Sequence, residues 1–167
     1  MKKTFQVINE LKKRGLIVDY AVGGGIATIF YTETFLTYDL DIFIVVKFHP
    51  EKNIIDLSYL FDYLTSEGYK WKGEHIVIED IPVQFIVADE LEKEAIENAR
   101  SIKYEGEEIK IFSPEYLIAI LLRTGRKKDI EKVEKITEQA EFDEQKLKMI
   151  LKKFGIKGGR QWRRNRK

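Results

Sequence analysis

Residues 21–27 read Ala-Val-Gly-Gly-Gly-Ile-Ala, and residues 37–44 read Thr-Tyr-Asp-Leu-Asp-Ile-Phe-Ile. The first stretch predicts a buried strand at 16–22 that ends in a glycine turn, followed by a helix at 26–32. The second stretch is rich in β-branched and apolar residues, so it predicts a strand at 39–46. A glycine turn before a helix, followed by a strand with two carboxylates, indicates an α/β fold with a phosphate and metal site.

The glycine turn has the properties of a phosphate-binding loop. Glycine permits positive φ angles and lets backbone N–H groups approach a ligand closely. The helix N-terminus that follows adds unpaired N–H donors and the positive end of the helix dipole, and both favour phosphate. Short glycine motifs also form tight turns without a ligand. Gly24 and Gly25 therefore indicate a nucleotide site only in combination with the carboxylates.

The two carboxylates, Asp39 and Asp41, are separated by one residue in the predicted strand. Side chains two positions apart share one face of a strand, roughly 6.5–7 Å from each other. Carboxylates this close repel unless a cation lies beside them, and their oxygens suit Mg²⁺. Leu40, Ile42 and Ile44 would then face the core. The alternative is a solvated polar end of the strand.

The remaining sequence predicts helices and strands around this centre. In chain order we expect a helix at 4–14, a helix at 54–66, strands at 75–78 and 82–87 joined by a turn at 79–80, a helix at 89–99, a hairpin at 102–104 and 109–112, and helices at 114–124, 129–140 and 143–154. This order predicts an α/β (α+β) core at 1–112, a helical part at 113–156 of the same compact unit, and a basic flexible tail at 157–167.

The composition excludes several classes of protein. The chain has no cysteine, which excludes disulfides and cysteine-based zinc sites, and its two histidines are too few for a histidine cluster. The N-terminus lacks the apolar segment of a signal peptide, and no apolar run is long enough to span a bilayer. We therefore expect a soluble cytoplasmic protein with no membrane partner. Abundant Lys, Glu and Ile are typical of a thermophile.

In the glycine turn and the aspartate pair, the sequence resembles a known family, the DNA polymerase beta-type nucleotidyltransferase superfamily. Its signature is Gly-Gly or Gly-Ser followed, after a short gap, by Asp-x-Asp on a strand, and Gly24-Gly25 and Asp39-Leu40-Asp41 fit it. Thr37 stands where relatives often have threonine. Pro-Glu-x-Leu at 114–117 and Arg-x-Lys-Asp at 126–129 are similar to the small prokaryotic branch related to abortive-infection toxin nucleotidyltransferases.

This resemblance implies a nucleotidyltransferase fold with a small mixed sheet flanked by helices. It also implies Mg²⁺- or Mn²⁺-dependent transfer of NMP from an NTP to a hydroxyl of an RNA, a protein or a small molecule. A cognate protein partner, as in toxin–antitoxin pairs, is a further implication. The implied metal ligands are Asp39 and Asp41, and the implied nucleotide-binding residues are Gly24, Gly25, Thr37, Arg126 and Lys128.

The sequence departs from the family pattern at Gln84, where relatives carry a third carboxylate on a neighbouring strand. A neutral amide does not act as a base and adds no negative charge for a second metal. Gln84 could instead be a surface residue on an edge strand. The resemblance therefore predicts either an enzyme with Asp39, Asp41 and Gln84 at its catalytic centre, or an inactive relative that binds a nucleotide or a partner.

The helical part departs from the pattern as well, because Leu121 stands where relatives often carry lysine. Replacement charge for a triphosphate is available from Arg123 and from residues 126–128. For Arg123 and Lys127 a solvated basic helix end is the simpler interpretation. For Asp129 the sequence favours the role of N-cap of the next helix.

The tail at 157–167 carries six basic and no acidic side chains. Trp162 lies among its arginines, so the tail could bind nucleic acid through phosphate contacts and base stacking. The alternative is a solvated tail without a partner. A nucleic-acid-binding protein that uses this tail is thus a third interpretation of the chain.

Overall fold

The computed structural model describes residues 1–33, 36–51 and 54–158 of the 167-residue chain. The strands of this described part form one mixed sheet of seven strands in the order β3-β4-β5-β2-β1-β7-β6. Their bounds are β1 Asp19–Val22, β2 Leu40–Val45, β3 Lys70–Lys72, β4 His75–Ile78, β5 Ile81–Val87, β6 Arg100–Tyr104 and β7 Glu107–Ile111.

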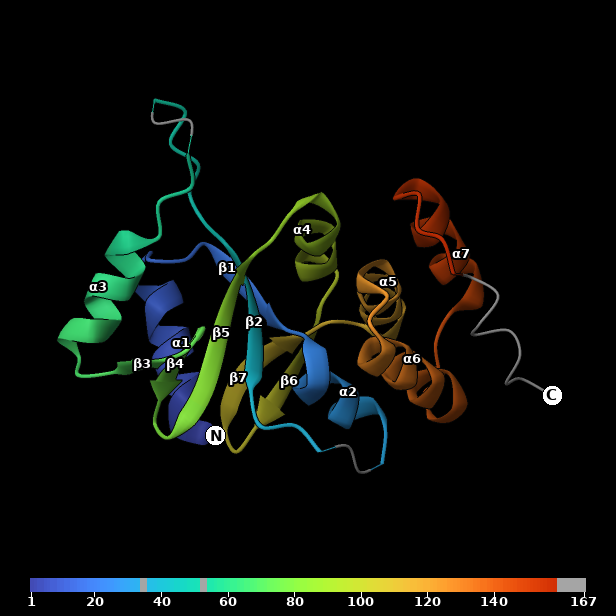
Figure 1. The fold of residues 1–167 in the computed structure, drawn as a ribbon, viewed down its shortest axis with the longest axis horizontal. Helices are drawn as coiled ribbons and strands as arrows, with labels where there is room; N and C mark the ends of the chain where they lie inside the picture. The colour runs from blue at the N-terminus through green and yellow to red at the C-terminus, as the bar shows by residue number, and fades with distance from the viewer. Residues whose placement is uncertain (34–35, 52–53, 159–167) are drawn as a thin grey trace.

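Helices surround this sheet. They are α1 Lys2–Lys13, α2 Gly24–Tyr31, α3 Ser58–Ser66, α4 Glu90–Glu97, α5 Pro114–Thr124, α6 Lys127–Gln139 and α7 Glu144–Lys153. Figure 1 shows α5, α6 and α7 grouped at one end of the molecule and α1 and α3 at the other, with the sheet between them. The predicted α/β class, with a mixed sheet flanked by helices, is confirmed.

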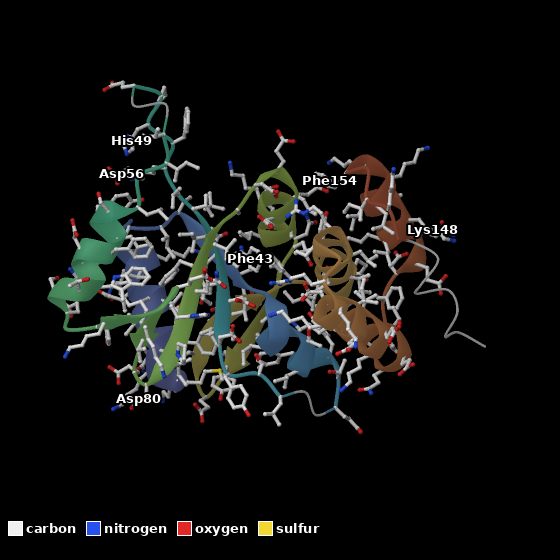
Figure 2. The ribbon with its side chains drawn as sticks, in the orientation of Figure 1. Phe43, His49, Asp56, Asp80, Lys148 and Phe154 are labelled. Atoms are coloured by element: carbon white, nitrogen blue, oxygen red, sulfur yellow. The ribbon has the colours of Figure 1, made fainter. Side chains whose placement is uncertain are left out.

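β2 lies in the middle of the sheet and determines the position of the carboxylates. It pairs antiparallel with β1 and parallel with β5. Leu40, Ile42 and Ile44 are fully buried on one face, as their spacing predicts. Phe43 lies on the other face near the centre of the molecule (Figure 2), with its ring centroid 4.9 Å from that of Phe112. Both faces of β2 are therefore covered, and Asp41 shares the face of Phe43.

α2 begins two residues earlier than predicted. The carbonyl oxygen of Gly23 accepts the first helical hydrogen bond, from the N–H of Ala27 at 3.1 Å. The helix therefore starts at Gly24, inside the glycine run, and not at Ile26. The backbone N–H groups of its first turn consequently belong to the glycines themselves.

Other boundaries differ because the sequence signal is weak there. β1 is shorter than predicted and begins at Asp19. α3 begins only at Ser58, whose N–H donates to the side chain of Asp56 at 2.9 Å. β3 was not predicted, since its residues, Lys70–Lys72, are all exposed and lack an alternating pattern. The turn at Glu79 and Asp80 is confirmed, and both residues adopt positive φ angles.

α5 is the most buried helix in the described part of the chain. All residues from Pro114 to Leu122 are buried, because α2, α4, α6 and α7 all contact it. Gly125 ends the helix in the left-handed conformation with a φ of 63°, which glycine adopts without strain. In the described residues no helix is both long and apolar enough to cross a membrane.

Candidate functional site

Each glycine of the turn, Gly23 to Gly25, lies so close to a neighbouring side chain that a Cβ atom would clash. A Cβ atom on Gly24 would lie 1.8 Å from Oδ2 of Asp41, and one on Gly23 would lie 2.4 Å from the ring of Phe43. A Cβ atom on Gly25 would lie 2.5 Å from Oγ1 of Thr37. Gly24 also has a φ of 54°. The first turn of α2 and the carboxylate of Asp41 therefore approach each other over a surface that has no room for a side chain.

The two aspartates occupy the same end of β2. Asp41 is half-buried, and the side chain of Asp39, just before the strand begins, is 43% exposed. Desolvation, followed by the negative charge of Asp39, raises the pKa of Asp41 above its usual value. The pair thus has the mutual repulsion that its spacing predicts, and a bound cation would relieve it.

Thr37 contacts the carboxylate pair through its hydroxyl. Its Oγ1 lies 3.2 Å from Oδ1 of Asp39 and 3.4 Å from the carbonyl oxygen of the same residue, and both are acceptors. Its methyl and hydroxyl groups also fill the space above Gly25. In this arrangement Thr37 orients Asp39 and packs on the glycine turn.

Gln84 lies beside Asp41. The parallel register of β2 and β5 pairs Asp41 with Gln84, and paired residues in adjacent strands point to the same face. β5 is not an edge strand, because it pairs with β4 on one side and β2 on the other. The interpretation of Gln84 as an edge-strand surface residue is therefore wrong, and the half-buried amide faces the carboxylate pair.

His75 belongs to the same cluster, although the sequence did not identify it. Its Nε2 lies 3.4 Å from Oδ2 of Asp39, and its side chain is 27% exposed. This nitrogen is inaccessible to solvent and makes no hydrogen bond with the described residues. In the hairpin of β4 and β5, Ile76 pairs with Val83, so His75 lies next to Gln84. The hairpin predicted around the turn at residues 79–80 could therefore have placed His75 beside Gln84 from the sequence.

A group of charged side chains extends the site on α6. Asp129 is fully buried and accepts hydrogen bonds from Thr124 at 2.7 Å, Arg126 at 2.6 Å and Lys132 at 3.3 Å. Burial opposes its ionisation, yet the bonds from Arg126 and Thr124 and the attraction of Lys132 hold its pKa below the usual value. The sequence favoured Asp129 as the N-cap of this helix, and that prediction is wrong. α6 begins earlier, and its N-cap is Arg126.

Lys132 is the second residue that the sequence did not identify. Its side chain is only 9% exposed. Among the groups whose electrostatic interaction lowers the pKa of Asp41, Lys132 has the largest effect. The buried positions of α6 include Asp129, Lys132 and Val133. That spacing is typical of one face of a helix, so the sequence pattern could have predicted that Lys132 lies on the buried face of α6.

The other basic candidates occupy different surroundings. Arg126 is exposed apart from its ion pair with Asp129, and Lys128 is exposed in the first turn of α6. Arg123 does not form a solvated helix end, because it forms ion pairs with Asp89 and Glu92 of the α4 N-terminus. Leu121 is buried in α5. The structure thus brings Gly24, Gly25, Thr37, Asp39, Asp41 and Gln84 together and leaves Lys128 at the surface.

The residues present fit one Mg²⁺ or Mn²⁺ ion. Among the described residues no three His, Asp or Glu side chains converge to hold a metal ion. Mg²⁺ is commonly bound by one or two carboxylates together with phosphate oxygens and water, and Asp39 and Asp41 supply that pair. Residues 159–167 of the predicted basic tail lie outside the described part of the chain.

Comparison with solved structures supports the fold. A crystal structure of an antigenic nucleotidyltransferase-like protein from Paracoccidioides brasiliensis has a TM-score of 0.54 and 18% identity, over 92% of this chain and 88% of that chain. The crystal structure of ANT(2")-Ia in complex with adenylyl-2"-tobramycin has a TM-score of 0.51 and 16% identity, over 93% and 98%. A solution structure of the antibiotic-resistance factor ANT(2'')-Ia has a TM-score of 0.51 and 14% identity, over 91% and 89%.

These likenesses show that the chain has a nucleotidyltransferase-like fold. Neither protein-family models nor curated proteins match the sequence. The resemblance to the abortive-infection branch therefore stays a prediction, as do the roles of the individual site residues.

Proposed function

We propose that this protein is a nucleotidyltransferase that transfers NMP from an NTP to a hydroxyl group of an RNA, a protein or a small molecule. The observation that carries the proposal is the close approach of the α2 N-terminus to Asp41, where a Cβ atom on Gly24 would lie only 1.8 Å from Oδ2 of Asp41. A helix N-terminus favours phosphate and a carboxylate pair favours a divalent cation. An NTP is a ligand that requires both.

Different residues of the site would bind the phosphates and the metal ion. The backbone N–H groups of Gly24 and Gly25 would donate to phosphate oxygens at the helix N-terminus. Asp39 and Asp41 would hold one Mg²⁺, with Thr37 orienting Asp39 through its hydroxyl. When bound, the metal would neutralise charge on the phosphates during transfer.

The reaction would be an in-line substitution at the α-phosphorus. The acceptor oxygen forms the new P–O bond while the bond to the β-phosphate oxygen breaks, so pyrophosphate leaves with the electron pair. The proton of the acceptor hydroxyl is released to water. Positioning and electrostatic stabilisation account for most of the rate in phosphoryl-transfer sites, and the backbone N–H groups of the turn between β1 and α2 are suited to both.

A second candidate function is binding without transfer. Gln84 occupies the position beside Asp41, where a carboxylate could help to activate an acceptor hydroxyl. A neutral amide does not accept a proton at ordinary pH. In this second case the fold would bind nucleotide, with or without a protein partner, and would not turn it over.

Transfer of α-labelled NTP to total RNA, to the protein itself and to small hydroxyl compounds distinguishes these candidates. For an enzyme we expect Mg²⁺-dependent labelling that falls at least about a hundredfold in Asp39→Asn and in Asp41→Asn, since each removes half of the metal-binding charge. Asp62→Asn, an exposed aspartate of α3, is the matched control and should be unchanged. Equal labelling in all variants would overturn the proposal.

Calorimetry with the same proteins tests the binding-only candidate. NTP that binds to the unmodified protein but is never transferred would favour it, and transfer gained in Gln84→Asp would strengthen that conclusion. Robust transfer by the unmodified protein would rule it out.

A further inference from the structure

The buried lysine of α6 has an unusual position for a cation. Lys132 lies on the inner face of the helix with Asp129, Val133 and Ile136, and lysine is rarely buried unless paired. α6 contacts α2, the helix that carries the glycine turn. A buried lysine therefore lies on the helix that packs on α2, and the first turn of α2 approaches the carboxylate of Asp41.

Asp129 holds this lysine in place. Its Oδ1 accepts a hydrogen bond from Nζ of Lys132 at 3.3 Å, while its Oδ2 accepts bonds from Thr124 and Arg126. One buried carboxylate thus orients two cations. Asp129 carries one negative charge and Arg126 and Lys132 carry one positive charge each, so the formal charges of these three side chains sum to +1.

The strand beside Asp41 lacks the negative charge that a second divalent cation would need. Gln84 is neutral and stands beside Asp41 in the sheet. In the described residues no cluster of three His, Asp or Glu side chains is arranged around a metal position. His75, whose Nε2 lies 3.4 Å from Oδ2 of Asp39, adds no negative charge to the site either.

We propose that Lys132 supplies, as a permanent part of the protein, the positive charge that a second divalent cation would otherwise bring to the bound triphosphate. The site then takes one divalent cation, held by Asp39 and Asp41. This inference rests on the proposed function, because it assigns a nucleoside triphosphate to that site. Asp129 is a positioning residue, since it acts through the two cations that it holds, Lys132 and Arg126.

The proposal predicts changes of opposite sign for metal and nucleotide. In Lys132→Met the carboxylates lose a nearby positive charge, so Mn²⁺ alone should bind about tenfold more tightly. The triphosphate loses the same charge, so a non-hydrolysable NTP analogue should bind about tenfold more weakly. A purely structural role would weaken both. Methionine keeps the unbranched shape of the lysine stem, which favours retention of the fold.

Electron paramagnetic resonance with Mn²⁺, with and without the analogue, measures stoichiometry and affinity together. The unmodified protein should bind one Mn²⁺ per chain in both cases, and Lys132→Arg should resemble it. The matched control is Lys148→Met, a lysine at the outer edge of α7 (Figure 2), which removes the same charge far from the site and should change neither affinity. Circular dichroism and thermal unfolding monitor the fold of each variant.

The outcomes separate this inference from the function on which it rests. Two Mn²⁺ per chain in the unmodified protein, or parallel weakening of both ligands in a folded Lys132→Met, would overturn the role of Lys132 while Asp39→Asn and Asp41→Asn still abolish Mn²⁺ binding. Mn²⁺ binding that is absent, or unaffected by either aspartate variant, would overturn the proposed site itself and the inference with it.

Discussion

Gly24 is a glycine for two independent reasons. Its φ of 54° lies in the left-handed region, and Oδ2 of Asp41 occupies the place where its Cβ atom would be. Gly73, in the turn between β3 and β4, has a similar φ of 64° but nothing within 4 Å of its Cβ position. Comparing substitutions at the two positions therefore distinguishes the cost of a left-handed backbone, which both share, from the cost of a steric clash, which only Gly24 has.

We expect Gly73→Ala to lower the free energy of unfolding by about 1 kcal/mol, the cost of placing alanine in the left-handed region. Gly24→Ala should cost about 2 kcal/mol beyond that, because the new methyl group also displaces the carboxylate of Asp41. Urea unfolding curves of both variants measure the difference. Equal losses would show that Asp41 moves aside freely, and NTP binding would then survive in Gly24→Ala.

Asp19 links three elements and confers a defined pH dependence. It accepts hydrogen bonds from Lys12 of α1 at 2.8 Å and from Lys110 of β7 at 2.6 Å. Burial alone would raise its pKa, but the bonds from Lys110 and Lys12 lower it below the ordinary value of 3.8. The stabilisation is therefore present above the pKa of the unfolded carboxyl and is lost as the pH falls through the lower, folded value.

Asp19→Asn should consequently lower the free energy of unfolding by about 1 kcal/mol at neutral pH. The difference from the unmodified protein should shrink as the pH falls below 3.8. Denaturant unfolding across this range checks the prediction, with Asp62→Asn as the control on an exposed aspartate. A difference that stays constant with pH would assign the effect to packing.

The sequence identified residues whose relation is local and missed those whose relation depends on packing. Asp39, Asp41 and their buried neighbours follow the two-residue period of a strand, and the predicted alternation is confirmed. His75 reaches Asp39 only because β4, β5 and β2 are adjacent. Lys132 acts electrostatically on Asp41 because α6 docks on α2. Neither pairing can be derived from spacing along one element.

The N-terminus of α4 shows how one residue can stabilise a helix and its neighbour together. Asp89 and Glu92 form a capping box, in which each side chain accepts a hydrogen bond from the other residue's backbone N–H. Arg123 of α5 forms ion pairs with both carboxylates. The sequence predicted the helix start from Asp89 but assigned Arg123 to solvent, because the partner lies on another helix.

Asp89→Ala removes both interactions, so it should destabilise the protein by about 2 kcal/mol. Asp143→Ala is the comparison, because Asp143 caps α7 through the N–H groups of Gln145 and Lys146 without an ion pair to another helix. It should cost about 1 kcal/mol. Thermal unfolding of both variants gives the contribution of the Asp89–Arg123 ion pair as the difference. Equal costs would mean that this ion pair adds nothing.

The molecule as a whole is organised around α5. Its buried length contacts four other helices, α2, α4, α6 and α7. The sequence indicated a helix here but not its central position, because a helix that is apolar all round shows no preferred face. The sequence pattern changes near residue 112 from α/β to helical, but the residues on both sides of this boundary pack into one hydrophobic core.

We therefore expect residues 1–112 alone to remain unfolded. Removal of 113–167 would expose the faces of α2 and α4 that α5 covers, and lost apolar burial of this extent exceeds the marginal stability of a domain. Circular dichroism and hydrogen exchange test this, and deletion of 157–167 is the control that should retain one cooperative transition. A folded 1–112 fragment would show that the helical part is a separate domain.

Gly25 and Thr37 impose a joint constraint on how this sequence can diverge. Gly25 has an ordinary helical φ, so only the hydroxyl and methyl of Thr37 exclude a side chain there. A descendant with alanine or serine at position 25 would first need a smaller residue at position 37. Substitutions at these two positions should therefore be accepted in order and appear as a correlated pair among homologues, whereas position 24 should stay invariant wherever Asp41 is kept.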